Sequence, residues 1–134
     1  MTRVLVVHHD VDLADLEVEA LRHAGYEVDQ CGGPTHAILA CPVMRGRPCW
    51  QVDAADVVVY DAWAAGDGAG NLMADLRVLY PDMPVVLTSS GMELDWEEQD
   101  PARRTASVAG APTRANLAAA IEEALAKARV AVAG

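Results

Sequence analysis

Two adjacent histidines and an aspartate follow a short apolar run near the start of the chain. The run is residues 3–7 (RVLVV), and His8, His9 and Asp10 come directly after it. Imidazole and carboxylate groups bind Zn²⁺, so His8 and His9 could hold such a metal together with Asp10 or Asp61. Strand side chains alternate between two faces, so both imidazoles reach one ion only if the chain bends. A protonated imidazole near Asp61 could instead sense pH between about 5 and 8.

A second group of possible ligands lies further along the chain. Cys31, His36, Cys41 and Cys49 have the spacing C-x4-H-x4-C-x7-C in an irregular stretch. Thiolates and imidazoles bind Zn²⁺, but the short C-x2-C and C-x4-C pairs typical of zinc sites are missing. We therefore expect ordinary thiols and no bound metal. Zinc binding is one alternative, and thiol redox chemistry is another, because two arginines between Cys41 and Cys49 favour a thiolate.

Polar residues also end two later apolar runs. Asp61 ends residues 55–61 (ADVVVYD), and Thr88 with Ser89 follows the apolar part of residues 83–90 (MPVVLTSS). The carboxyl ends of parallel strands lie at one edge of a sheet, where the functional crevice of such folds is found. We therefore expect these residues and the two histidines to converge on one edge.

The elements that position these residues alternate between two patterns. Continuous apolar runs predict strands at residues 3–7, 26–31, 55–61, 83–90 and 105–110. Helical periodicity predicts helices at residues 10–25, 35–40, 69–80 and 113–128. Residues 41–53 are predicted to be a loop, and residues 92–105 are ambiguous, with a short helix around Trp96. Five β/α alternations with apolar strands indicate an α/β fold with a doubly wound parallel sheet covered on both faces.

The periodicity also predicts which side chains face the core. In the first long helix these are Leu13, Leu16, Ala20, Leu21 and Ala24. In the helix over residues 69–80 they are Leu72, Leu76 and Leu79. In the last helix, which Thr113 caps, they are Leu117, Ile121, Leu125 and Ala128.

Length and charge exclude several classes of function. The chain has 134 residues, which we expect to form a single domain over residues 1–134. Its formal net charge of −10 argues against nucleic acid or an anionic membrane as partner. No N-terminal segment is apolar for long enough to be a signal peptide or a membrane span. An odd number of cysteines, three, fits a cytoplasmic protein without a disulfide framework.

This order of motifs resembles the receiver domain of two-component response regulators, a CheY-like superfamily. The matching stretches are VLVVHHD (residues 4–10), DVVVYD (56–61), PVVLTSS (84–90) and AGAPTRANLAAAIEEAL (109–125). The resemblance implies a five-stranded, flavodoxin-like (βα)5 domain. We expect no output domain in this chain.

The resemblance also assigns roles at the predicted edge. Asp61 takes the position of the phosphoacceptor, and Thr88 takes that of the hydroxyl that senses the phosphoryl group. His8 and His9 stand where the family has two acidic residues that hold Mg²⁺. Of the nearby carboxylates, only Asp10, displaced by one residue, could partly compensate. The two histidines are then remnants of an abandoned Mg²⁺ site, with one ring bonded to Asp61.

The remaining family positions are altered as well. The lysine before proline is Ala111 here, followed by Pro112, and the aromatic switch position falls on Val108. Phosphoryl transfer needs cations to neutralise charge on the equatorial oxygens, and loss of one such partner commonly costs ~2.7–4 kcal/mol of barrier. Mg²⁺ also requires oxygen ligands, so we expect neither Mg²⁺ nor another cofactor to be bound.

These observations predict an atypical receiver, or pseudo-receiver, that is not an enzyme. It is expected to signal by docking to a protein partner: a histidine kinase, another signalling protein or a second copy of the chain. The docking face predicted by resemblance consists of the fourth helix, fifth strand and last helix. The first alternative is a metal or redox sensor on the same fold that uses Cys31, Cys41 and Cys49. The second is a phosphorelay receiver phosphorylated on Asp61.

Overall fold

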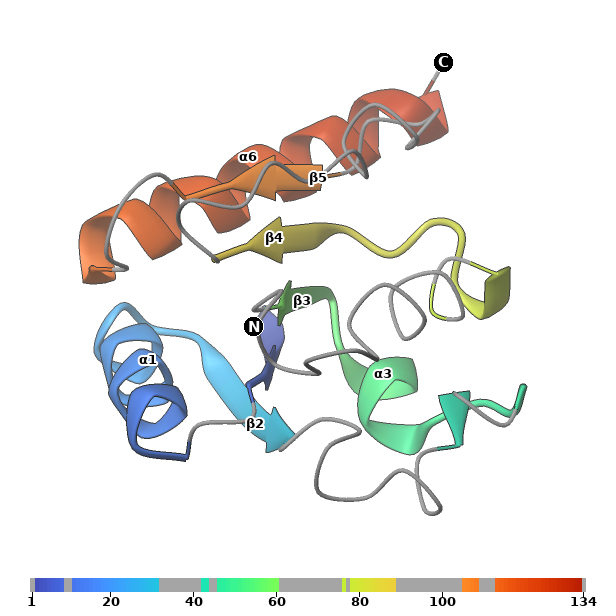
Figure 1. The fold of residues 1–134 in the computed structure, drawn as a ribbon. Coiled ribbons are helices and arrows are strands. Elements are labelled where there is room, and N and C mark those ends of the chain that lie inside the picture. Colours follow the sequence, from blue (N-terminus) through green and yellow to red (C-terminus); the bar gives the residue numbers. More distant parts are fainter. Residues whose placement is uncertain are drawn as a thin grey trace.

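The computed structural model describes residues 2–8, 11–31, 42–43, 46–60, 76, 78–88, 105–108 and 113–133. These residues form a parallel sheet between two layers of helices (Figure 1). The predicted helix over 35–40, residues 92–104 of the ambiguous segment and Leu72 lie outside the described residues.

Five strands make up the sheet, in the order β2-β1-β3-β4-β5. They are β1 (Arg3–Val7), β2 (Glu27–Cys31), β3 (Val57–Tyr60), β4 (Val85–Leu87) and β5 (Thr105–Ser107). All neighbouring strands are parallel. The chain moves outward from β1 to β2 and then returns to the other side of β1, so the winding direction reverses between β1 and β3. This topology confirms the predicted doubly wound α/β fold.

Three helices are described: α1 (Val11–His23), α3 (Trp50–Ala54) and α6 (Arg114–Ala133). Helices α1 and α6 cover one face of the sheet, and α3 lies on the other face (Figure 1). The residues of β1 show the division, since Val4 and Val6 pack with α1 and α6, whereas Leu5 and Val7 pack with α3. Because both faces are covered, the strands are apolar throughout.

The prediction for α1 was wrong by one position around the helix. Leu13 and Leu16, predicted to face the core, are 50% and 64% exposed, and Ala24 is exposed as well. Leu21 is buried as predicted, and the other buried residues of α1 are Ala14, Glu17 and Val18. Small side chains let the helix approach the sheet closely, and a buried carboxylate is acceptable only with a polar partner.

Helix α6 follows its prediction more closely. Leu117 and Ile121 are buried, and Leu125 is partly buried against the same core. Thr113 caps the helix as predicted, because its Oγ1 accepts a hydrogen bond from the Asn116 backbone N–H at 3.2 Å. The helix continues to Ala133, beyond its predicted end at residue 128.

Two further predictions concern the opposite face of the sheet. Residues 50–53, predicted as loop, belong to α3, which buries Val52 against the sheet. The prolines of this stretch lie upstream of α3 and so do not interrupt it. Leu76 is buried and Leu79 packs against the same cluster, as predicted.

Strand β2 lies at an edge of the sheet, and side chains cover its outer carbonyls. Residues 27 and 31 bond to the β1 side, so the alternate residues Val28 and Gln30 face outward. Arg22 of α1 donates to the Val28 carbonyl at 3.3 Å, and Gln51 of α3 donates to the Gln30 carbonyl at 3.3 Å. These contacts block pairing of another strand at this edge.

Candidate functional site

The carboxyl ends of the central strands are level with one another. Val7 of β1 is in register with Cys31 of β2 and with Tyr60 of β3, and Tyr60 is in register with Leu87 of β4. The last residues of four strands therefore form one row across the sheet.

Two of the predicted site residues stand in the next row. The His8 backbone N–H donates to the Cys31 carbonyl at 3.1 Å, and the Thr88 N–H donates to the Tyr60 carbonyl at 3.1 Å. These bonds extend the ladders of β1 and β4 by one residue, on either side of β3. The structure thus brings His8 and Thr88 to the same edge of the sheet.

Several of the other residues singled out from the sequence fall outside the described part of the chain. They are His9, Asp10, Asp61, Ala111 and Pro112 at the predicted edge, and His36 and Cys41 in the cysteine-containing stretch. Their roles remain predictions.

The side chain of His8 faces α1. Strand side chains alternate, so His8 continues the face on which Val4 and Val6 pack with the α1 and α6 layer. His8 is only 3% exposed, and its Nε2 lies 3.8 Å from Oε2 of Glu17. Glu17 is itself buried on the inner face of α1.

This contact explains why α1 can carry a carboxylate on its buried face. A buried charge is strongly unfavourable unless another polar or charged group compensates it. His8 supplies such a group, and as an imidazolium it would form an ion pair with Glu17. Glu17 was not predicted from the sequence, because the leucines suggested a different inner stripe. The repeat of Ala14, Val18 and Leu21 would have placed Glu17 beside the strand.

Thr88 presents a different environment on the other side of β3. It is 3% exposed, and its Oγ1 has no hydrogen-bond partner among the residues that the structure describes. Buried hydroxyl groups normally have a partner, and lack of one costs roughly 1–3 kcal/mol. The hydroxyl can donate to, or accept from, a group at this edge.

The residues that the structure describes at this edge do not form a site that fits Mg²⁺. The ion requires near-octahedral oxygen ligands, usually including one or two carboxylates. His8 supplies a ring nitrogen, buried against Glu17, at the position where the resemblance places a carboxylate ligand.

The described cysteines lie on the α3 side of the sheet. Cys31 ends β2, Cys49 precedes α3, and both are partly buried against the same apolar cluster. Within the described ranges, no group of three or more His, Cys, Asp or Glu side chains could hold a metal ion. The alternative of a four-ligand zinc site includes two residues outside these ranges, His36 and Cys41, so the structure does not test it.

A polar contact that the sequence did not reveal joins α3 to the segment before β4. Tyr80 donates to Oδ1 of Asp53 at 2.6 Å, and its hydroxyl accepts from the Cys49 backbone N–H at 2.9 Å. Burial raises the pKa of Tyr80, and the hydrogen bond to Asp53 raises it further. The contact fixes α3 to the segment before β4. It involves no residue of the edge that carries His8.

The chain resembles known proteins in fold but not in overall sequence. No known family profile matches it, and no curated protein matches it in sequence. Solved structures do match. A response regulator receiver domain from Clostridium thermocellum is 16% identical, with a TM-score of 0.71 over 97% of this chain and 98% of that chain. A CheY-like receiver domain from Methanospirillum hungatei is 15% identical, with a TM-score of 0.71 over 96% and 97%.

A longer protein matches in the same way. NtrX from Brucella abortus, in complex with ADP, is 22% identical with a TM-score of 0.68 over 97% of this chain. The chain spans only 28% of the length of NtrX. The fold of this chain is therefore that of a response regulator receiver domain. None of its described helices is long and apolar enough to cross a membrane.

Proposed function

We propose that the chain is an atypical receiver that acts as a protein-interaction module in signalling and is not phosphorylated in the conventional way. The observation that carries this proposal is the burial of His8 against Glu17 at the carboxyl end of β1. An imidazole engaged in packing α1 onto the sheet stands where the receiver fold would present a metal-binding carboxylate.

The electrostatics of phosphoryl transfer support the proposal. Charge that builds on the transferred group must be neutralised by positioned cations. One source of positive charge is missing because His8 and His9 stand at the acidic positions that would hold Mg²⁺. A second is missing because Ala111 stands at the lysine position. Asp61 alone would be a carboxylate that repels the phosphoryl donor.

Thr88 is compatible with a binding role that does not require covalent chemistry. Its buried hydroxyl can hydrogen-bond to an anion or a partner group at the edge of the sheet. We infer a module whose output is association and not turnover, with a histidine kinase, another signalling protein or a second copy as partner.

Exposure to a small phosphodonor tests the proposal. We expect incubation with acetyl phosphate or phosphoramidate and Mg²⁺ to leave the intact mass of the protein unchanged, because the cations needed for transfer to Asp61 are missing. A known phosphorylatable receiver treated in parallel establishes that the donor is active. An added phosphoryl group that disappears in Asp61→Asn would contradict the proposal and favour the phosphorelay alternative.

A further inference from the structure

A shallow groove lies between α1 and the edge strand β2. Its volume is about 480 Å³, and its lining residues are Asp15, Val18, Glu19, Arg22, His23 and Gln30. Pockets that bind small molecules typically occupy about 300–1,000 Å³. The groove is therefore large enough to hold a small metabolite, and Val18 gives it an apolar floor between polar side chains.

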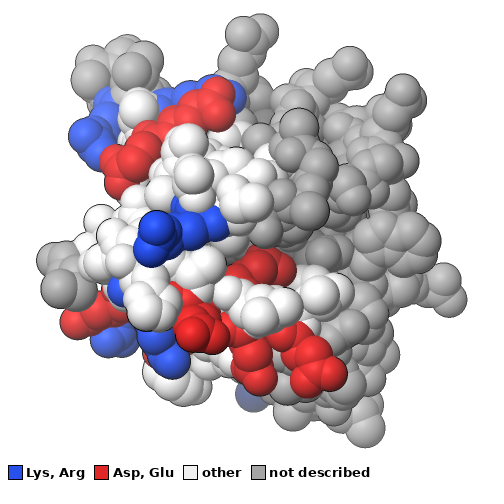
Figure 2. Space-filling view, turned by 90° about the vertical axis from the view of Figure 1, so that its left-hand side faces the viewer, with Lys and Arg blue, Asp and Glu red and all other residues white. Residues whose placement is uncertain are grey.

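Charges of both signs line this groove. Asp15 and Glu19 supply two carboxylates and Arg22 supplies one guanidinium, which gives a net charge of −1 when histidine is counted as neutral. Figure 2 shows acidic and basic side chains close to one another on the face that includes α1. A ligand that complements the groove therefore carries both positive and negative groups, with positive charge in excess.

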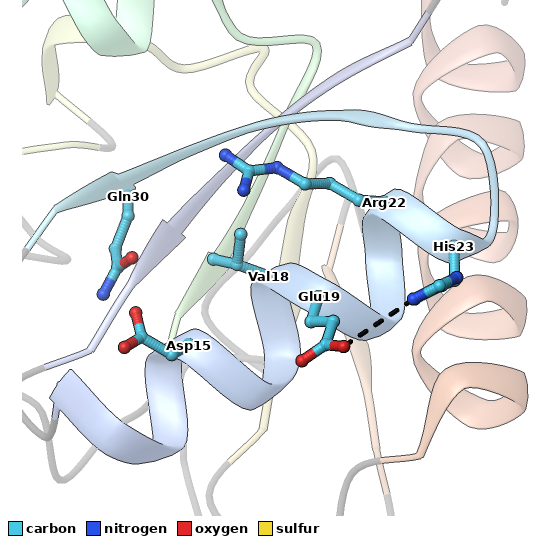
Figure 3. Close-up of a pocket in the computed structure, with 6 residues that line it drawn as sticks. All are labelled: Asp15, Val18, Glu19, Arg22, His23 and Gln30. Atoms are coloured by element: carbon cyan, nitrogen blue, oxygen red, sulfur yellow. Dashed lines mark ion pairs between the residues drawn. The ribbon is translucent and has the colours of Figure 1, made fainter.

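The polar groups of the groove have unused hydrogen-bonding capacity. Asp15 and Gln30 point toward each other across it, yet neither side chain bonds to another residue in the part of the chain that the structure describes (Figure 3). Arg22 extends toward β2, where its guanidinium donates to the Val28 carbonyl at 3.3 Å. A guanidinium has five N–H donors, so Arg22 retains further donors for a ligand.

We propose that this groove binds a free α-amino acid with a cationic side chain, such as lysine. The α-carboxylate of the ligand accepts hydrogen bonds from Arg22, because a guanidinium matches the planar geometry of a carboxylate. The α-ammonium donates to Asp15 and to the side-chain carbonyl of Gln30. The aliphatic part of the ligand lies over Val18, and its terminal cation reaches Glu19.

The spacing of the two carboxylates fits the two amines of such a ligand. Asp15 and Glu19 are four residues apart on α1, which is about 6 Å along the helix axis. An extended aliphatic chain joins the α- and ε-nitrogen atoms of lysine and spans a comparable distance. Glu19 also lies 3.7 Å from Nε2 of His23, but both side chains are exposed, so water weakens this contact and Glu19 stays accessible.

The two α groups distinguish a free amino acid from other cations. In a lysine residue of a partner protein, both groups belong to amide bonds and cannot pair with Arg22 or Asp15. A diamine has two cations but no group for Arg22. The inference goes beyond the proposed interaction module and does not depend on it, because the lining of the groove does not include His8 or Thr88.

Titration with L-lysine, followed by backbone amide NMR signals, tests the proposal. We expect saturable shifts at Val18, Arg22 and Gln30, with a Kd on the order of 1 mM, because the ligand is small and the groove is open. Norleucine lacks the terminal cation, cadaverine lacks the carboxylate, and Nα-acetyl-lysine amide lacks both α charges. Each of these three compounds should bind at least about tenfold more weakly than lysine.

Variants test the two ends of the ligand separately. Asp15→Asn should weaken the binding of lysine and cadaverine alike. Arg22→Gln should weaken lysine binding about tenfold but should not weaken cadaverine binding, because only lysine carries the carboxylate. The matched controls are Asp12→Asn and Arg114→Gln, at exposed residues outside the groove, and each should change affinity by less than about twofold. Circular dichroism confirms that each variant is folded, which is expected at exposed positions.

Several results would overturn the inference. One is the absence of saturable shifts with lysine up to about 20 mM, or shifts that lie only outside the groove. Another is equal affinity for lysine and cadaverine, which would indicate general attraction of cations. Equal affinity for Nα-acetyl-lysine amide would point to a lysine residue of a partner protein, and equal losses in the control variants would exclude the assigned contacts. The assay contains no phosphodonor, so its failure leaves the proposal about Asp61 standing.

Discussion

His8 and Thr88 occupy equivalent places at the carboxyl edge of the sheet, yet their environments differ. Both residues are 3% exposed and extend their ladders by one bond on either side of β3. The imidazole of His8 lies beside the carboxylate of Glu17, at 3.8 Å. The hydroxyl of Thr88 has no hydrogen-bond partner within the described ranges.

The difference separates a structural role from a binding role at one edge. On the β1 side, Nε2 of His8 and Oε2 of Glu17 lie within ion-pair distance and hold α1 on the sheet. On the β4 side, a buried hydroxyl without a partner among the described residues costs stability, and a valine of the same shape would not. The contact with Glu17 gives His8 a structural role, whereas the hydroxyl of Thr88 could fill the binding role proposed above.

Removal of Glu17 should produce the largest effect. We expect Glu17→Ala to reduce the free energy of unfolding by about 3 kcal/mol, because it leaves His8 buried without its carboxylate and opens space under α1. Urea denaturation of the two proteins measures this difference. The exposed Glu19→Ala on the same helix is the control and should change stability by less than about 0.5 kcal/mol.

Replacement of both partners sharpens the same contrast. The double variant His8→Leu/Glu17→Leu should recover most of the stability, since apolar residues of similar volume often substitute well for a buried pair. If Glu17→Ala is as stable as the original protein, or the double variant is as unstable as the single one, the pair has no structural role.

Thr88 should respond in the opposite direction. We expect Thr88→Val to leave the free energy of unfolding unchanged or to raise it by up to about 1 kcal/mol, because the change removes a buried hydroxyl and keeps the shape. Thermal and urea unfolding measure it. A loss of more than about 1 kcal/mol would mean that the hydroxyl makes a stabilising hydrogen bond, and the contrast with His8 would fail.

The smallest effect is expected at a hydrogen bond between a tyrosine that directly precedes β2 and a carboxylate of α6. Tyr26 donates to Oε1 of Glu122 on α6 at 2.8 Å. Burial raises the pKa of Tyr26 from 10.0 to about 12, and the hydrogen bond and charge of Glu122 add to the effect. The folded state thus favours the protonated phenol. This stability is fully present below the unfolded pKa and is lost as pH rises through the folded pKa of about 12.

Unfolding measured between about pH 9 and 12 tests this sign. The original protein should lose stability across the window, and Tyr26→Phe should lose less. The result compares Glu122, a carboxylate partner exposed to water, with Glu17, a carboxylate buried beside His8. Identical slopes for the two proteins would show that Tyr26 does not contribute to the pH dependence.

The sequence was sufficient for the sheet because the strands are buried on both faces. Runs such as residues 57–60 contain only side chains that fit a covered parallel sheet, so their pattern leaves little choice. Helix α6 was predictable for a related reason, since Leu117 and Ile121 mark its buried face and Thr113 its start.

Helix α1 shows where sequence reasoning fails. Its leucines are more hydrophobic than Ala14 or Val18, so they dominate any search for an apolar stripe. The orientation is decided instead by close packing and by the compensation of Glu17 by His8, a residue that precedes the helix. Such pairing depends on tertiary structure, and the same error concealed both the Glu17 contact and the exposure of Leu13 and Leu16.

Titration with Mg²⁺ tests most directly whether the edge has lost its cation-binding chemistry. Calorimetry should detect no saturable Mg²⁺ binding up to about 10 mM, because His8 is a ring nitrogen held beside Glu17 and Mg²⁺ needs oxygen ligands. The variant His8→Asp/His9→Asp, with Glu17→Leu to avoid two buried carboxylates in contact, should bind the ion. Saturable one-site binding by the original protein, lost in Asp61→Asn, would contradict the account.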